Sequence, residues 1–169
     1  MKTAYFDIDT QLDFVYPSGS LYVPGAERIV PRIAALNREA IAAGHLLIAT
    51  MDAHSENDTE FMVWPHHCVS GTLGQRKPEQ TLVAGMRIIK KQSVDCFTNL
   101  ELARMLAADG VQNAVVYGVV TEICVKNAVR GLLDRGIGVR VVPDAVKELS
   151  ASARDHFFDD LRAGGGVVG

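Results

Sequence analysis

One cysteine stands where a helix is expected to begin. Cys124 lies in the segment TEICV, directly after a continuous apolar run. The free amides at a helix N-terminus favour a thiolate and can also hold an oxyanion. Cys124 is therefore a candidate nucleophile for attack on a carbonyl carbon. A small buried helix residue facing a sheet would give the same pattern, so the position alone leaves both interpretations open.

A nucleophilic thiol needs a proton acceptor, and its tetrahedral intermediate needs a proton donor for the leaving group. Asp9 ends the first predicted strand and could serve as this base. Lys91 ends the third predicted strand and could orient Asp9 or stabilise the thiolate. Asp7 and Asp13 compete with Asp9 for the role, and Lys91 taken alone is more typical of a solvated strand end.

A long segment from residue 53 to 84 is rich in His, Pro, Gly and Ser. Loops of this length in compact domains are usually functional or disordered, and the histidines favour a function. Asp52, His54 and the pair His66 and His67 offer one carboxylate and imidazoles, which suit zinc, manganese or iron. Because the last two are adjacent, one of them is expected to ligate. A set of polar loop residues without a metal is the simpler alternative.

Strand and helix patterns alternate along the chain and predict the elements that position these residues. Strands are expected over residues 3–9, 45–52, 87–91, 113–120 and 139–142. Helices are expected over 26–43, from a capping box of Thr98 and Glu101 to Ala108, from Thr121 to Gly136, and from Ser150 to about Ala163. The tail, residues 164–169, adds a short edge strand or frays.

This alternation predicts an α/β fold, a mainly parallel sheet flanked by helices in three layers, in one domain over residues 1–169. In such sheets ligands bind beyond the carboxyl ends of the strands. Asp9, Asp52, Lys91 and the turn at Thr121 all fall at those ends, which places the candidate chemistry at one edge of the sheet.

Composition narrows the function classes. The chain has 169 residues, 48% apolar and 22% charged, and a net charge of −3, which is typical of a globular domain. No basic stripe points to nucleic acid, and no signal-peptide pattern or long apolar run points to a membrane. Three widely spaced cysteines favour a reduced cytoplasmic protein. No GxGxxG or GxxxxGK[ST] supports a nucleotide-cofactor domain.

Several motifs resemble one family, in the family's order. DTQLDF (9–14) is similar to the DxQxDF opening of isochorismatase-like cysteine hydrolases, and GVVTEICV (118–125) resembles their nucleophile turn. The segment from Lys91 to Phe97 and GIGVRVVPDA (136–145) also resemble the family's pattern.

The resemblance implies the isochorismatase-like, Rossmann-like topology and a triad of Asp9 as base, Lys91 as supporting cation and Cys124 as nucleophile. It leaves Asp13 a structural role. It also implies a cis peptide bond between Val119 and Val120, which would aim the amides of Val120 and Cys124 at one oxygen.

Within the superfamily, D-x-H followed by WPxHCxxGT resembles the metal loop of nicotinamidases. This resemblance implies a divalent metal held by Asp52, His54 and His67. Glu60 stands near the place of a further histidine and could ligate through oxygen. The resemblance also implies Phe14 and Trp64 as aromatic pocket walls, although ordinary core packing explains them equally well.

The implied activity is amide hydrolysis through a Cys124 thioester, most similar to conversion of nicotinamide to nicotinate and ammonia in NAD salvage. The implied partner is a small-molecule amide, and a homo-oligomer is expected. Val94 stands where an aromatic residue usually helps to close the pocket of nicotinamidases, and the segment after Lys91 is shorter than in many of them. Alternatives are hydrolysis of an N-carbamoyl or ureido amide and, in another class, a non-catalytic metal-binding or interaction domain.

Overall fold

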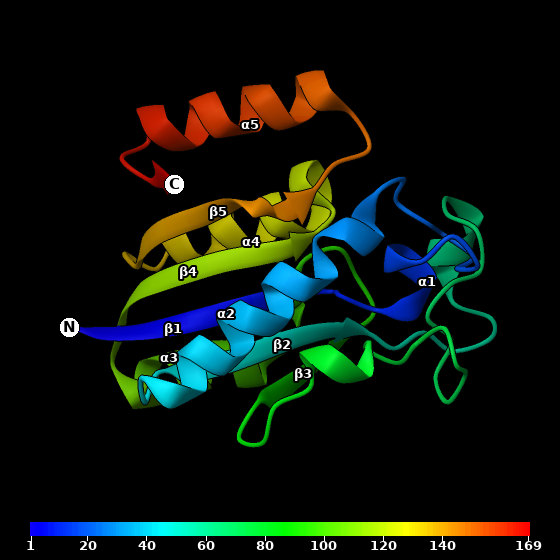
Figure 1. Ribbon diagram of the computed structural model, residues 1–169, viewed down its shortest axis with the longest axis horizontal. Helices are drawn as coiled ribbons and strands as arrows, with labels where there is room; N and C mark the ends of the chain where they lie inside the picture. The colour runs from blue at the N-terminus through cyan, green and yellow to red at the C-terminus, as the bar shows by residue number, and fades with distance from the viewer.

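Six parallel strands form one sheet in the order β3-β2-β1-β4-β5-β6. The computed structural model describes residues 1–169, and Figure 1 shows the sheet with its covering helices. The strands are β1 (Lys2–Ile8), β2 (Leu46–Asp52), β3 (Arg87–Lys91), β4 (Val111–Val119), β5 (Gly138–Lys147) and β6 (Val167–Val168).

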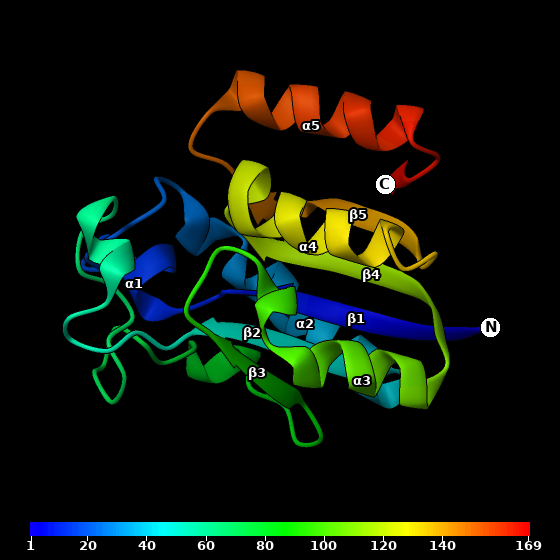
Figure 2. The same ribbon diagram turned by 180° about the vertical axis from the view of Figure 1, so that it is seen from behind.

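Helices cover both faces of the sheet. In Figure 1 α2 (Val30–Ala42) lies in front of the sheet, and in Figure 2 α3 (Leu100–Asp109) and α4 (Lys126–Leu133) lie in front. In both views α5 (Ala151–Ala163) lies along the side of the sheet nearest β5. This arrangement confirms the predicted three-layer parallel α/β fold. No helix combines the length and apolar character that crossing a bilayer requires.

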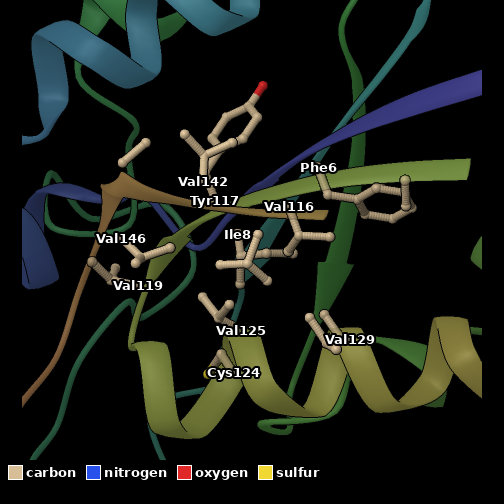
Figure 3. Packing of buried hydrophobic residues seen from close by; sticks show 14 of the residues in the cluster. Phe6, Ile8, Val116, Tyr117, Val119, Cys124, Val125, Val129, Val142 and Val146 are labelled. Atoms are coloured by element: carbon tan, nitrogen blue, oxygen red, sulfur yellow. The ribbon is translucent and has the colours of Figure 1, made fainter. Parts of the chain in front are cut away.

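Alternate side chains of the strands form the core between the sheet and α4. Phe6 and Ile8 of β1 and Val116 of β4 belong to one buried cluster with Val125, in the turn after β4, and Val129 of α4 (Figure 3). All five residues are buried. This apolar layer holds the start of the helix against the carboxyl ends of β1 and β4, where the candidate site lies.

The predicted capping box of Thr98 and Glu101 is wrong. Asn99 is the N-cap of α3, and its side-chain oxygen accepts a hydrogen bond from the backbone amide of Glu101 at 2.9 Å. Thr98 lies one residue earlier, in a 3-10 turn, and its hydroxyl donates to the carbonyl of Asp95. Asparagine competes well with threonine as an N-cap, and the sequence pattern did not distinguish the two.

Other boundaries shift where local rules compete. The predicted helix over 26–43 divides into a 3-10 turn, Ala26–Arg28, and α2, which carries Pro31 in its first turn as expected. The strand predicted to end at Val142 continues to Lys147 as β5, past a register shift on β4. Ser150 caps α5 by accepting a hydrogen bond from Ala153, as predicted.

Candidate active site

The carboxyl ends of four strands bring the candidate residues together. Asp9 directly follows β1, Asp52 ends β2, Lys91 ends β3, and Cys124 lies in the turn after β4. Since parallel strands end at the same edge of a sheet, residues far apart in the sequence become neighbours there.

Asp9, Lys91 and Cys124 form a buried cluster. Lys91 Nζ lies 2.8 Å from Asp9 Oδ2 and 3.9 Å from Cys124 Sγ. Asp9 has a φ of 48°, a left-handed conformation that aspartate adopts more readily than most residues. Thr50 fixes this conformation, because its hydroxyl donates to Asp9 Oδ1 at 2.6 Å and its carbonyl accepts from the Asp9 amide at 3.2 Å. Lys91 also pairs with Asp52 Oδ1.

Burial dominates the electrostatics of this cluster. It raises the pKa of the Cys124 thiol well above its ordinary value, and the Lys91 ammonium offsets part of that effect. Burial also raises the pKa of Asp9, against the lowering effect of Lys91. For Lys91, burial alone would lower the pKa, but Asp9, Cys124 and Asp52 raise it overall. The sequence predicts a thiol pKa lowered by the helix N-terminus, so this prediction is wrong for the buried resting thiol.

The two competing carboxylates have other partners. Asp7 pairs with Lys77 at 3.1 Å and accepts a hydrogen bond from Asn37. Asp13 accepts hydrogen bonds from the backbone amides of Ser20 and Cys68 at 3.2 and 2.7 Å, and so joins three chain segments. Neither contacts Lys91, which leaves Asp9 as the acid–base candidate beside the thiol.

The turn that carries Cys124 has an unusual backbone. The peptide bond between Val119 and Val120 is cis, at the position where the resemblance places such a bond. Thr121–Val125 forms a π-helical turn that leads into α4. Gly118 precedes it with a φ of 118°, and a Cβ there would lie 2.1 Å from the Ile8 carbonyl oxygen. Only glycine allows β4 to pass this close to β1.

Asp52, His54 and His67 offer ligand atoms that all lie within 4.8 Å of one another. Asp52 Oδ2 is 3.8 Å from His54 Nε2 and 3.7 Å from His67 Nε2. The other ring nitrogens are occupied, His54 Nδ1 by Asp58 at 3.0 Å and His67 Nδ1 by the carbonyl of Pro65 at 2.6 Å. These outer contacts orient both Nε2 atoms toward the carboxylate, as in histidine metal sites.

The donor set fits a divalent metal. His54 Nε2 is buried and has no hydrogen-bond partner, which is costly for a polar atom unless it ligates. Glu60 Oε2 lies 4.0 Å from this nitrogen and can add a fourth ligand. His66 is exposed and stacks on Phe61 at 4.2 Å between ring centroids, outside the cluster.

A buried amide supports the metal loop. Gln11 Oε1 accepts from the Asp52 amide at 2.7 Å, and its Nε2 donates to the carbonyls of Asp52 and Gln75 at 2.9 and 2.8 Å. The sequence analysis gave Gln11 no role, although it is the glutamine of the DTQLDF motif. That motif is the signal that could have identified it.

One pocket joins the cysteine to the metal cluster. It encloses about 480 Å³, part of it open to solvent, and reaches Cys124, Asp52, Glu60 and His67. Phe14 and Trp64 line it, as the resemblance implies, together with Val94, Val119 and Val120. The sequence analysis missed five further apolar or aromatic walls. Ile123 lies within the motif of the nucleophile turn, and the other four lie in segments without motif or periodicity: Leu21, Tyr22, Val23 and Leu149.

Comparison with known proteins fits this geometry, and the isochorismatase domain family matches residues 3–169. The chain belongs to the isochorismatase family of hydrolases. The nicotinamidase/pyrazinamidase of Mycobacterium tuberculosis is 27% identical over 172 residues, covering 92% of this chain and 91% of that protein.

Two solved structures of the family are informative. The pyrazinamidase of Pyrococcus horikoshii in complex with zinc is 30% identical, with a TM-score of 0.94, and covers 100% of this chain and 99% of that one. The N-carbamoylsarcosine amidase of Thermoplasma acidophilum is 26% identical, with a TM-score of 0.88 over 99% and 95% of the two chains. The family therefore includes similar folds with different amide substrates.

Proposed function

We propose that the protein is a metal-assisted cysteine amidohydrolase that converts nicotinamide to nicotinate and ammonia. The observation that carries this proposal is the single pocket onto which Cys124 and the cluster of Asp52 and His67 both open. A thiol beside a carboxylate and an ammonium supports acyl transfer. The similarity to a nicotinamidase/pyrazinamidase and to a zinc-bound pyrazinamidase supports the substrate.

In the proposed reaction Asp9 accepts the Cys124 proton as sulfur attacks the amide carbon. The carbonyl π bond opens, and the negative charge on oxygen is stabilised by the amides of Val120 and Cys124. Asp9 then gives its proton to the nitrogen of the former amide, the carbonyl bond re-forms as the C–N bond breaks, and ammonia departs to leave a thioester. Asp9 next accepts a proton from water as the water oxygen attacks the thioester carbon. The C–S bond then breaks, and Asp9 returns the proton to the sulfur, which releases the carboxylic acid and restores the thiol.

Lys91 holds Asp9 in place in this scheme and supplies the positive charge beside the sulfur. Its distances of 2.8 Å to Asp9 and 3.9 Å to Cys124 allow both roles. Since burial raises the pKa of Cys124, the thiol stays protonated until substrate enters, and proton transfer to Asp9 accompanies attack.

Asp52, His54 and His67, with Glu60 as a further candidate, would hold the metal, which we expect to be zinc, manganese or iron. Bound there, it would supply a Lewis acid for a heteroaromatic nitrogen of the substrate. The chain's own part is to present the two imidazoles with their Nε2 atoms free, which Asp58 and Pro65 ensure.

The pocket walls favour a neutral, flat substrate. Phe14, Tyr22 and Trp64 contribute aromatic rings, and Ile123 contributes an aliphatic wall. Lys91 is the cation closest to the thiol, and it already faces the carboxylates of Asp9 and Asp52. A substrate with a free carboxylate, as in N-carbamoyl amino acids, would therefore find no lysine or arginine side chain among the pocket walls. The similarity to N-carbamoylsarcosine amidase keeps N-carbamoyl or ureido amides as the second candidate.

The decisive experiment measures ammonia release from nicotinamide and from N-carbamoylsarcosine, with metal content assayed on the same preparation. We expect release from nicotinamide by the wild type and none by Cys124→Ala. Release from N-carbamoylsarcosine alone would replace the proposed substrate with the second candidate. Release from neither by folded, metal-loaded protein would overturn both and favour a non-catalytic metal-binding domain.

Three free cysteines fit a reducing cytoplasm, where we place the protein. We also expect a homo-oligomer, by resemblance to the family, and light scattering on the purified protein tests this expectation.

A further inference from the structure

One wall of the pocket comes from a different part of the fold than the others. Leu149 lies in the segment that joins β5 to α5, and it is the only pocket residue that follows Cys124 in the sequence. Its side chain is 49% exposed, so it stands at the mouth of the pocket rather than at its base. A larger substrate would meet this residue before it reached the thiol.

The nucleophile turn itself holds Leu149 in place. Glu122 lies two residues before Cys124, and its Oε1 accepts hydrogen bonds from the backbone amides of Leu149 at 3.0 Å and Ser150 at 2.7 Å. One carboxylate oxygen thus joins the turn that carries the nucleophile to the mouth of the pocket. Hydrogen bonds to a charged acceptor are stronger than neutral ones, which makes this a firm connection.

The only hydrogen bonds that the Glu122 carboxylate accepts come from the backbone amides of Leu149 and Ser150. Its second oxygen, Oε2, is buried and has no hydrogen-bond partner. Ser150 is the N-cap of α5, so Glu122 also places a negative charge at the positive end of that helix. On the other side of Leu149, Glu148 pairs with Arg154 of α5 at 2.9 Å. Both residues that flank Leu149 are therefore held in place, Ser150 by Glu122 and Glu148 by Arg154.

We propose that Leu149 is a specificity-determining residue that limits the size of the acyl group the pocket admits, and that Glu122 is the positioning residue that keeps it there. This inference rests on the proposed amidase function for its substrate class, a neutral aromatic carboxamide. Nothing in the proposed acid–base chemistry requires Glu122 or Leu149. Their effect is therefore expected in substrate selection and KM rather than in kcat for a small amide.

The first test compares a one-ring amide, nicotinamide, with a fused two-ring amide, quinoline-3-carboxamide. Leu149→Ala should raise the ratio of kcat/KM for the two-ring amide over the one-ring amide by about tenfold, because a pocket discriminates by this amount for small apolar changes. Leu82→Ala is the matched control, since Leu82 is 50% exposed and lies outside the pocket. An unchanged ratio in Leu149→Ala overturns the proposal.

The second test addresses Glu122. Glu122→Ala should shift the same ratio in the same direction through KM, with kcat for nicotinamide within about threefold of wild type. Glu122→Gln keeps an oxygen that can accept both amide hydrogen bonds and should restore the wild-type ratio. An equal loss of kcat for both amides in Glu122→Ala, with the ratio unchanged, would show that Glu122 does not act through Leu149.

A readout that does not depend on hydrolysis separates this proposal from the proposed function. The rates at which iodoacetamide and the bulkier N-phenyl iodoacetamide alkylate Cys124 can be followed by mass spectrometry. We expect the bulky-to-small ratio to rise about tenfold in Leu149→Ala and not in Leu82→Ala. If the protein hydrolyses neither amide but this ratio rises, Leu149 guards the pocket and the proposed substrate is wrong. If the ratio does not rise, Leu149 does not limit access, whatever the substrate.

Discussion

Two aspartates at the end of β1, Asp7 and Asp9, each form a buried ion pair with a lysine, and the surroundings of the two pairs differ. In the first, Asp7 Oδ2 is 3.1 Å from Lys77 Nζ, and neither side chain is exposed. Thr10 donates to one oxygen of Asp7 and Asn37 donates to the other. Neither residue lines the pocket that holds Cys124, and we call this the closed pair because both oxygens of Asp7 have a donor, although Lys77 Nζ makes no hydrogen bond of good geometry.

The second pair, Asp9 and Lys91, opens toward the pocket. Lys91 faces a second carboxylate, Asp52, and the Cys124 thiol in addition to Asp9. Thr50 donates to Asp9 Oδ1, while Asp9 Oδ2 has no hydrogen bond of good geometry despite its contact with Lys91. An incompletely bonded oxygen can take up a proton. The comparison teaches that a buried carboxylate is structural when both of its oxygens accept hydrogen bonds, and that an oxygen without a donor leaves the carboxylate able to do chemistry.

The two lysines should therefore fail in different ways when they are replaced by methionine. Lys91→Met is expected to lower kcat by about 10²–10⁴-fold, because it removes the cation that supports Asp9 and Cys124. Lys77→Met should change the kcat of the folded protein by less than about tenfold. Ammonia release, normalised to the folded fraction, measures both. Equal losses of kcat would remove the distinction between the open and the closed pair.

The closed pair should matter for the stability of the fold rather than for turnover. Lys77→Met leaves Asp7 buried without its counter-ion and is expected to cost about 3–5 kcal/mol in the free energy of unfolding. The double variant Asp7→Asn with Lys77→Met should recover part of that loss, since it removes both charges. Urea unfolding followed by circular dichroism provides the measurement. A double variant less stable than Lys77→Met would contradict this account.

The adjacent residues His66 and His67 give a third comparison, between an exposed histidine and a candidate metal ligand. His67→Ala should remove bound metal and the stabilisation that it provides, about 2.7 kcal/mol at a metal concentration of 100 times Kd. His66→Ala is the adjacent control and should keep both, because His66 is exposed and lies outside the cluster. Metal analysis and melting with and without a chelator report the two effects. Loss of metal in His66→Ala would reassign the ligand.

The sequence predicted the open pair better than the closed one, for a physical reason. Asp9, Lys91 and Cys124 follow apolar strands, and parallel strands bring their ends together, so periodicity alone indicated a common site. Lys77 lies in the long loop over residues 53–84, where no period indicates which side chains turn inward. Asp7 was considered only as a competitor of Asp9, because its partner could not be seen.

The same limit applies to the pocket and to helix ends. Leu21 and Tyr22 reach the pocket from a turn, and Leu149 reaches it from the connection before α5, so only tertiary structure reveals them as walls. At α3, Thr98 and Asn99 were both acceptable caps, and the local backbone decided for Asn99. Long strands and helices were predictable because burial imposes a period, while loops and caps depend on contacts between distant segments.

Two threonines allow the smallest and sharpest test of the comparison. Each donates its hydroxyl to one of the two carboxylates, Thr10 to Asp7 and Thr50 to Asp9, and both are fully buried. Valine replaces either with nearly the same shape. Thr10→Val should cost about 1–3 kcal/mol of stability and leave kcat near wild type, because a buried acceptor in the closed pair loses its donor.

Thr50→Val should instead act mainly on turnover. It removes the hydrogen bond that steadies Asp9 while Lys91 still neutralises the carboxylate, so we expect kcat to fall about tenfold with a smaller loss of stability. It also removes a bond that favours the charged form of Asp9 and should therefore raise the pKa of Asp9 further. The acidic limb of the pH profile of kcat should move to higher pH in Thr50→Val and stay in place in Thr10→Val. Movement of the limb in both variants would mean that the closed pair also affects the chemistry, and that the hydrogen bonding of the carboxylate is not what separates the two.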